Sequence, residues 1–268
     1  MDFETIRVEA DGPLGRLTLN RPERLNAMNA RMLRELVEAA RWFDEQREVR
    51  VVIVSGAGRA FCAGADLKES PASEALPGSG KSWLYRREAA QSGRRMADAI
   101  EQMRATTIAR LHGHIVGGGV VLASACDLRV ASEDARFSIP EIELGIPLAW
   151  GGIPRLVREI GPAMTKELVM TCREFTPREA RAMGFVNRVA PFEELGSEVE
   201  RLAADIIRQP SVPVVITKEH VNAVSRAMSA GLTAFGDGEA LMSALSDPES
   251  IEARKDYTAR RLKNKSDD

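Results

Sequence analysis

In the first part of the chain, segments with the hydrophobic pattern of strands alternate with a segment that has the pattern of a helix. Residues 6–10 and 15–20 are short extended runs, and the turn-forming residues 11–13 between them predict a hairpin. From residue 26 to about residue 47, apolar side chains recur every three or four positions, which predicts an amphipathic helix. The apolar run at 50–55 is short enough to be a buried strand. Strands and helices therefore alternate from the start of the chain.

The same alternation continues to about residue 131 and later gives way to helices alone. We expect a long polar helix at 81–103, a strand at 107–111, a short helix ending at 125 and a strand at 128–131. After residue 198 the pattern predicts helices only, at 198–208, 212–229, 232–245 and 249–262. The sequence therefore predicts an α/β core over residues 1–197, followed by an all-helical region over residues 198–268.

Composition narrows the classes of function. The 268 residues carry 37 basic and 39 acidic side chains, mixed along the chain, for a formal net charge of −2. Because no strong field can recruit nucleic acid or an anionic membrane, we expect neither as a partner. Three cysteines without a Cys-x-x-Cys pair argue against a disulfide framework, and the N-terminal segment lacks the apolar stretch of a signal peptide. Since no apolar run is long enough to span a membrane, we expect a soluble cytoplasmic protein.

Two loops rich in small residues carry the strongest chemical signal. Residues 61–68 read FCAGADLK, and residues 115–127 read IVGGGVVLASACD. Glycine allows backbone turns that other residues cannot make, and small side chains leave neighbouring N–H groups open to a ligand. Two such donors aimed at one point can hold the oxygen of a thioester while it becomes an enolate. Further along the chain, Glu141 after Pro140 adds a single carboxylate.

Five ordered motifs together resemble the crotonase superfamily, the enoyl-CoA hydratases and isomerases. They are residues 19–26 (LNRPERLN), 61–68, 117–127, Pro140-Glu141 and 184–188 (GFVNR), so the resemblance covers most of the chain. It implies a core built as a spiral of ββα turns, and a helical tail that packs in a homotrimer or a dimer of trimers. It also implies an acyl-CoA thioester as the substrate, with no metal or redox cofactor, since CoA is part of the substrate.

The resemblance also assigns the catalytic groups. It implies that the N–H groups of Ala65 and Gly118 form the oxyanion hole, and a helix that starts at Gly118 would favour negative charge there. Glu141 matches the family's acid/base glutamate. Hydratases of the family typically carry a second glutamate three residues after the oxyanion glycine, where this chain has Val121. Glu143 is an alternative acid/base residue, although alternation along an extended segment would point it away from Glu141.

The missing second carboxylate favours isomerisation. One base can move a proton from C2 to C4 of a 3-enoyl-CoA, and an apolar neighbour such as Val121 should raise the pKa of Glu141 toward neutrality. Hydration of a 2-enoyl-CoA to a 3-hydroxyacyl-CoA is the alternative, because hydratase is the commoner activity among relatives. A non-catalytic acyl-CoA-binding protein is a second alternative, which the retention of Glu141 opposes. RNA binding, known for a relative with a lysine-rich helix, is not expected because the helix at 26–47 mixes Arg with Glu.

Further residues are implied around the CoA moiety. The resemblance places five residues near the adenine and pantetheine: Arg24, Ala63, Asp66, Leu67 and Lys68. By side-chain chemistry alone, Asp66 and Asp127 are more typical of caps and turns than of proton carriers.

Two basic residues of the predicted tail and one tryptophan complete the candidate substrate site. Lys218 and Arg260 match tail positions that are basic in the family, sometimes serving a neighbouring subunit, but each is equally compatible with a solvated surface. Trp150 stands where the family usually has a small residue. It either narrows the acyl tunnel or packs the core.

His112 and His114 are not explained by the resemblance. On a strand, imidazoles two residues apart share a face and could bind a metal, but no third ligand lies nearby at metal spacing. A structural role is therefore the interpretation we favour, and His114 could also line the acyl pocket. Nucleotide-binding loops are not indicated either, because Phe61 stands where a third glycine would complete the fingerprint begun at 56 and 58.

Overall fold

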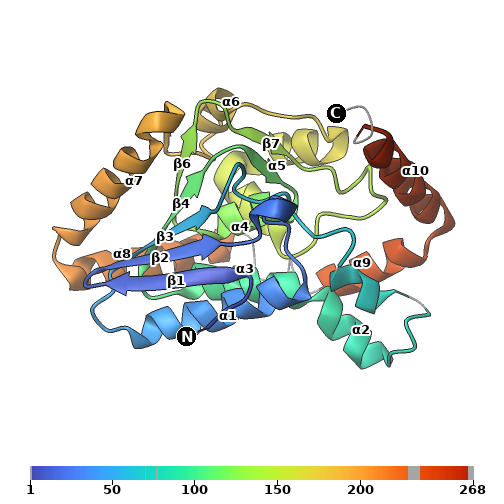
Figure 1. Ribbon diagram of the computed structural model, residues 1–268, viewed down its shortest axis with the longest axis horizontal. Coiled ribbons are helices and arrows are strands. Elements are labelled where there is room, and N and C mark those ends of the chain that lie inside the picture. The colour runs from blue at the N-terminus through green and yellow to red at the C-terminus, as the bar shows by residue number, and fades with distance from the viewer. Residues whose placement is uncertain (1, 70, 77, 229–235, 265–268) are drawn as a thin grey trace.

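The main sheet of the computed structural model, which describes residues 2–69, 71–76, 78–228 and 236–264, has six strands. Their order is β1-β2-β3-β4-β6-β8 (Figure 1). The predicted hairpin is present as β1 (Ile6–Asp11) and β2 (Leu14–Leu19). The strands that follow in the sheet are parallel: β3 (Val51–Gly56), β4 (Thr106–Leu111), β6 (Leu128–Ser132) and β8 (Arg188–Ala190). A separate pair consists of β5 (His114–Val116) and β7 (Arg136–Ser138), also parallel.

Helices cover both faces of the main sheet (Figure 1). In chain order the helical elements are η1 (Pro22–Arg24), α1 (Ala30–Glu45), η2 (Pro71–Ala75), α2 (Trp83–Ala90), α3 (Ser92–Gln102), α4 (Gly118–Ala125), α5 (Gly152–Thr171), α6 (Pro177–Ala182), α7 (Phe192–Ile207), α8 (Ser211–Met228), α9 (Asp237–Ser246) and α10 (Pro248–Asn264). The predicted α/β class with a helical C-terminal region is confirmed.

Alternation along the strands divides the core into two layers. On β3, Val52 and Val54 pack with α1, α3 and α4, whereas Val51 and Ile53 pack with α7 on the other face. A parallel strand that is buried on both faces reads as a continuous apolar run, which is the pattern at 50–55. The first layer is the larger one, and it contains the glycine loops.

Two predicted helices differ from the observed ones. The helix predicted from residue 26 begins at Ala30, because Asn29 caps it by accepting a hydrogen bond from the Met32 N–H at 2.9 Å. The side chain of Asn26 is used in the preceding loop, where it accepts from the Arg21 N–H and donates to two loop carbonyls. The helix predicted at 81–103 is interrupted at Gln91 and forms α2 and α3.

Helix α7 contradicts the predicted start of the helical region. It begins at Phe192, directly after Pro191, so the predicted boundary between residues 197 and 198 lies inside this helix. Its apolar face packs on the sheet through Leu195, Val199, Leu202 and Ala203. The helix therefore covers the α/β core, and the division into a core and an oligomerisation region stays a prediction.

The last three helices contact the core to different degrees. Helix α9 packs its Leu241, Met242 and Leu245 with Ala90 of α2, which places it close to the end of α2 (Figure 1). Helix α8 has no buried residue, and it exposes Val212, Ile216 and other apolar side chains. Among the described residues, no helix combines the length and apolar character needed to cross a membrane.

Candidate active site

The two glycine loops meet at Gly64. Cys62 bridges to Ile115 at the start of the second loop, and Met28 bridges to Ala65. Gly64 has a φ of 89°, and a Cβ atom placed on it would lie 2.7 Å from the carbonyl oxygen of Val116 and 3.5 Å from the amide nitrogen of Gly118. Only glycine permits this backbone conformation together with such a close approach. The two glycine loops therefore lie in contact, as the sequence predicted.

The amide groups predicted as oxyanion donors are not used by the fold. The N–H of Met28 donates to the carbonyl of Gly64 at 2.7 Å, and the carbonyl of Met28 accepts from the N–H of Asp66 at 3.0 Å. The N–H of Ala65, between these two residues, takes no part in this bridge. Among the described residues, neither the Ala65 N–H nor the Gly118 N–H has a hydrogen-bond acceptor. Gly118 is the first residue of α4, where free N–H groups and the helix dipole favour an anion.

The carboxyl group of Glu141 lies beside this helix start. Glu141 follows β7 in a turn that its own carbonyl stabilises by accepting from Leu144 and Ile146, both at 3.0 Å. A Cβ atom on Gly117 would lie 2.3 Å from Oε1 of Glu141, so the carboxyl group packs directly on that glycine. Its other oxygen, Oε2, is buried and has no hydrogen-bond partner among the described residues. A side chain held in this way can act as a proton carrier next to the helix start.

Burial sets the protonation of this carboxyl group. It raises the pKa of Glu141 to about 7, although a hydrogen bond from the residue's own backbone opposes the shift. The sequence predicted this direction and its cause. Glu143, the alternative acid/base residue, is exposed. The position three residues after Gly118 is the fully buried Val121 of α4, so no second carboxylate comes from that position.

Trp150 covers the other side of Gly118. A Cβ atom on Gly118 would lie 2.4 Å from Cζ3 of the indole and 3.2 Å from Cε of Met28. The ring also contacts two of the core clusters. The two interpretations left open by the sequence are therefore compatible, because this tryptophan packs the core at a point where it touches the candidate oxyanion glycine.

The residues predicted around CoA lie near the first loop. Ala63 donates to the carbonyl of Leu25 at 2.9 Å, which brings the loop next to Arg24. The side chains of Arg24, Leu67 and Lys68 are exposed. Asp66 is different: its buried carboxylate pairs with Arg21 at 2.8 Å and accepts from the N–H groups that follow it in the loop.

Arg21 and Asn26 are structural residues of the site that the sequence analysis missed. Arg21 ties the loop at Asp66 to the carbonyl of Ala27, and Asn26 ties the motif at 19–26 to the loop after β3. Both belong to the LNRPERLN motif, which was therefore the available signal. The motif indicated a family resemblance, but not which of its side chains hold the loops together.

Of the two basic residues of the tail, Lys218 is held by other residues and Arg260 is exposed. Lys218 donates to Asp127 and to the carbonyl of Ala105, both at 2.7 Å, and its side chain is only 9% exposed. Asp127 lies just beyond the C-terminal end of α4, a helix about 12 Å long at the usual rise per residue, whereas Gly118 is at its start. The interpretation of Asp127 as a structural residue agrees with these contacts and with its hydrogen bonds to Thr107. Arg260 lies exposed on α10.

The histidine pair does not form a shared face. Gly113 has a φ of 58° and separates β4 from β5, so His112 is buried and His114 is exposed. The strand geometry assumed for the pair is therefore wrong. Nε2 of His112 lies 2.9 Å from the carbonyl of Gly58, and burial lowers the pKa of the ring. No group of three potential metal ligands occurs in the part of the chain that the structure describes.

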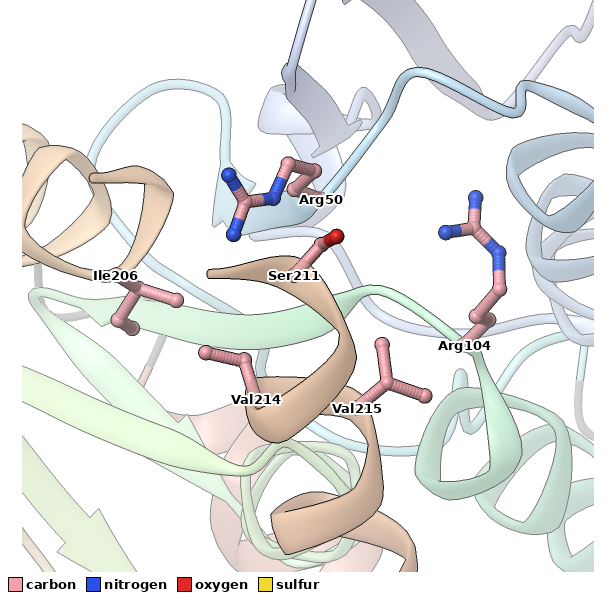
Figure 2. A pocket seen from close by; sticks show the side chains of 6 residues that line it. All are labelled: Arg50, Arg104, Ile206, Ser211, Val214 and Val215. Carbon is pink, nitrogen blue, oxygen red and sulfur yellow. The ribbon is translucent and has the colours of Figure 1, made fainter. Parts of the chain in front are cut away.

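A pocket at the start of α8 is separate from these residues. Figure 2 shows its lining, formed by Arg50, Arg104, Ile206, Ser211, Val214 and Val215. Arg50 donates to the carbonyls that end α7, and Arg104 donates to carbonyls that follow α1. Both guanidinium groups therefore fix backbone segments, and the lining contains no carboxylate, thiol or imidazole that could move a proton.

Comparisons with known proteins point to one family. A family model described as enoyl-CoA hydratase/isomerase matches residues 9–261. The chain is 36% identical over 244 residues to a probable enoyl-CoA hydratase of Mycobacterium bovis, with 87% of each protein covered. It is 38% identical over 221 residues to the peroxisomal Delta(3,5)-Delta(2,4)-dienoyl-CoA isomerase of Arabidopsis thaliana, covering 81% of this chain and 80% of that protein. An enoyl-CoA hydratase/isomerase from Mycobacterium paratuberculosis shares the fold, with a TM-score of 0.83, 24% identity and coverage of 96% of this chain and 100% of that one.

Proposed function

The chain belongs to the enoyl-CoA hydratase/isomerase family, and on that premise we propose that it is an enzyme that isomerises the double bond of an enoyl-CoA thioester. The observation that carries the proposal is the position of one buried carboxyl group, that of Glu141, on Gly117 at the start of α4. The free N–H groups of Ala65 and Gly118 supply the oxyanion hole.

The proposed reaction needs only these groups. The thioester oxygen accepts hydrogen bonds from Ala65 and Gly118 while Glu141 removes a proton from C2 of a 3-enoyl-CoA. The electron pair of the broken C–H bond forms a dienolate whose negative charge rests on that oxygen. The protonated carboxyl group then returns the proton at C4, and 2-enoyl-CoA leaves with no change in mass. A pKa of about 7 suits both halves of this transfer.

Val121 is the reason for preferring isomerisation. Addition of water requires a group that holds and activates the water, and the position of a second glutamate in hydratases is here a fully buried valine. Burial keeps the Glu141 carboxyl group from ionising readily, which suits a residue that takes up a proton and returns it. Hydration of 2-enoyl-CoA is the alternative function, favoured by the name of the Mycobacterium bovis relative, whereas the Arabidopsis thaliana relative is named as an isomerase.

For the CoA moiety, we assign the border of the site to Arg24, Ala63, Leu67 and Lys68. The side chains of Arg24, Leu67 and Lys68 are exposed and that of Ala63 is half-buried; all four lie along the first glycine loop and η1, whereas Asp66 shapes that loop from within. Arg260 is exposed and can meet a phosphate, but Lys218 would first have to leave Asp127. The chemistry requires no metal or redox cofactor, because CoA arrives as part of the substrate.

The proposal includes a homotrimer or a dimer of trimers that works in the cytoplasm. Support for assembly comes from α8, which buries none of its residues within the chain and exposes Val212, Ile216, Val221 and Val224, each at least half exposed. An apolar face of this kind is usually covered by another surface. The region 198–268, which contains this helix, is the proposed oligomerisation region.

The deciding experiment is incubation with 3-enoyl-CoA and 2-enoyl-CoA of several chain lengths, followed by separation and mass analysis of the products. Isomerisation leaves the mass unchanged, whereas hydration adds one water. We expect 3-enoyl-CoA to be converted faster than 2-enoyl-CoA is hydrated. Faster hydration would favour the hydratase alternative, and binding of every thioester without turnover would establish the non-catalytic alternative.

A further inference from the structure

Trp150 has a backbone conformation that bulky residues rarely adopt. Its φ is 61°, and the next residue, Gly151, also has a positive φ, of 70°. Left-handed backbone at an aromatic residue costs free energy, and such residues cluster at functional sites because the surrounding structure holds them in place. Trp150 precedes Gly151, the N-cap of α5, so the turn determines where the indole points.

The indole lies between two glycines on different helices. A Cβ atom on Gly93 of α3 would lie 1.9 Å from Cδ2 of the ring, and one on Gly118 of α4 would lie 2.4 Å from Cζ3. Neither helix therefore has room for a side chain where it meets the ring. The tryptophan fills the space between α3 and α4 next to the candidate oxyanion donor.

Several contacts prevent the indole from moving away. The N–H of Gly151 donates to the carboxylate of Asp237 in α9 at 2.7 Å. Arg155 donates to the carbonyl of Gly151 at 3.2 Å, and the buried Arg155 guanidinium is itself fixed by ion pairs with Asp98 and Glu101. The ring also packs on the cluster that contains Leu241, Met242 and Leu245 of α9. The turn is therefore held at both the N–H and the carbonyl of Gly151, and the ring packs on the cluster that includes residues of α9.

We propose that Trp150 closes the acyl pocket and restricts the substrate to thioesters of short acyl groups. The inference rests on the proposed function, which places the thioester carbonyl at Ala65 and Gly118. In this proposal the acyl chain extends from the oxyanion donors toward the space beside Gly118, and the indole already fills that space. Short chains keep their contacts with the oxyanion donors and Glu141, whereas long chains collide with the ring.

The test compares chain-length profiles of the wild type and Trp150→Ala. We expect kcat/KM of the wild type to be at least about tenfold higher for a four-carbon enoyl-CoA than for a ten-carbon one, since a few methylenes in a closed pocket account for such factors. In Trp150→Ala this preference should shrink by at least about tenfold. Trp42→Phe on α1 is the matched control, because Trp42 packs against Phe43 away from the glycine loops, and it should keep the wild-type profile.

If Trp150 had only a structural role, its replacement would not change the ratio of kcat/KM between short and long acyl chains. A folded Trp150→Ala protein with lower activity but an unchanged chain-length ratio overturns the proposal. Should Trp150→Ala fail to fold, Trp150→Phe retains most of the packing, and its ratio must then shift toward long chains by at least about threefold. An unchanged ratio in that variant also overturns the proposal.

Calorimetric titration with unreactive butyryl-CoA and decanoyl-CoA separates the two hypotheses. Tight binding of butyryl-CoA and weak binding of decanoyl-CoA by the wild type is the expected result. Equal affinity for the two overturns the role of Trp150 but leaves the proposed function intact. Binding of neither thioester overturns the proposed function itself, and with it this inference.

Discussion

The carboxyl group of Glu141 rests on Gly117, so closely that a Cβ atom on the glycine would lie 2.3 Å from Oε1. The glycine that ends β5 and caps α4 thus also makes room for the candidate acid/base residue. This contact explains how a helix start and a carboxyl group can occupy one small volume. It also means that the carboxyl group is positioned by packing, because its Oε2 has no hydrogen-bond partner among the described residues.

Gly117→Ala should displace Glu141 and lower kcat at least about 100-fold. The new methyl group would take the place of Oε1, and the φ of 50° would add strain of about 1–3 kcal/mol. Steady-state kinetics and thermal unfolding measure the two effects. Gly12→Ala is the matched control, because Gly12 has a φ of 52° with open space around it, and it should show the strain without the loss of activity. A normal kcat in Gly117→Ala would show that the contact between Gly117 and Glu141 is not needed for catalysis.

Glu141→Gln should lower kcat by at least about 1,000-fold while affinity for butyryl-CoA stays within about threefold of wild type. The amide has nearly the same shape but cannot accept the C2 proton. Glu143→Gln, an exposed change two residues further on, is the control and should retain activity. If Glu143→Gln lost activity and Glu141→Gln retained it, Glu143 would be the acid/base residue.

The raised pKa of Glu141 makes stability depend on pH. The carboxyl group titrates near 4.5 in the unfolded chain and at about 7 in the folded protein. Between these values the folded protein holds a proton that the unfolded chain has released, so its stability falls as pH rises through this window. The loss should total about 3 kcal/mol. Urea unfolding at pH 5 and pH 8 should show this loss relative to Glu141→Gln, which lacks the titrating group. If the free energy of unfolding changed by the same amount between pH 5 and pH 8 in both proteins, burial of the carboxyl group would be contradicted.

Val121→Glu should introduce or increase hydration of 2-enoyl-CoA. The change puts a carboxylate at the position where hydratases of the family carry their second glutamate, although ionising it in a buried apolar environment costs stability. Product masses measure hydration, and Val121→Gln is the control of similar size without a charge. A wild type that already hydrates crotonyl-CoA as fast as a two-glutamate hydratase would show that the missing carboxylate does not matter.

Ile216→Asp should weaken assembly. Ile216 is 56% exposed on α8, a helix without a fully buried residue, and a charge there opposes apolar contact with another copy. Light scattering at micromolar concentration should give the mass of a trimer or hexamer for the wild type and a smaller mass for the variant. Met170→Asp, an exposed apolar position on α5, is the control. A monomeric wild type would rule out the proposed oligomer.

The local sequence indicated strands β1 to β4 and β6, the helix start at Gly118 and the residues of the candidate site. Apolar runs and periods report which face of an element is buried, so β1 to β4 and the predicted α1 were recognisable, apart from their ends. The glycine loops and Glu141 were recognisable because an oxyanion hole needs small residues and free N–H groups near one carboxylate. The direction of the pKa shift of Glu141 was predicted from the sequence, and the structure attributes it to burial of the carboxyl group.

Contacts between distant segments could be decided only by the tertiary structure. Lys218 carries a basic side chain suited to a phosphate, yet it pairs with Asp127, 91 positions away, because α8 passes the end of α4. His112 and His114 would share a face on a regular strand, but the positive φ of Gly113 turns the backbone between them. Trp150 could line a tunnel or fill a core, and its contacts with Gly93 and Gly118 depend on how α3, α4 and α5 pack. Local patterns specify which residues are buried, whereas the partner of each side chain depends on packing between elements that the sequence separates.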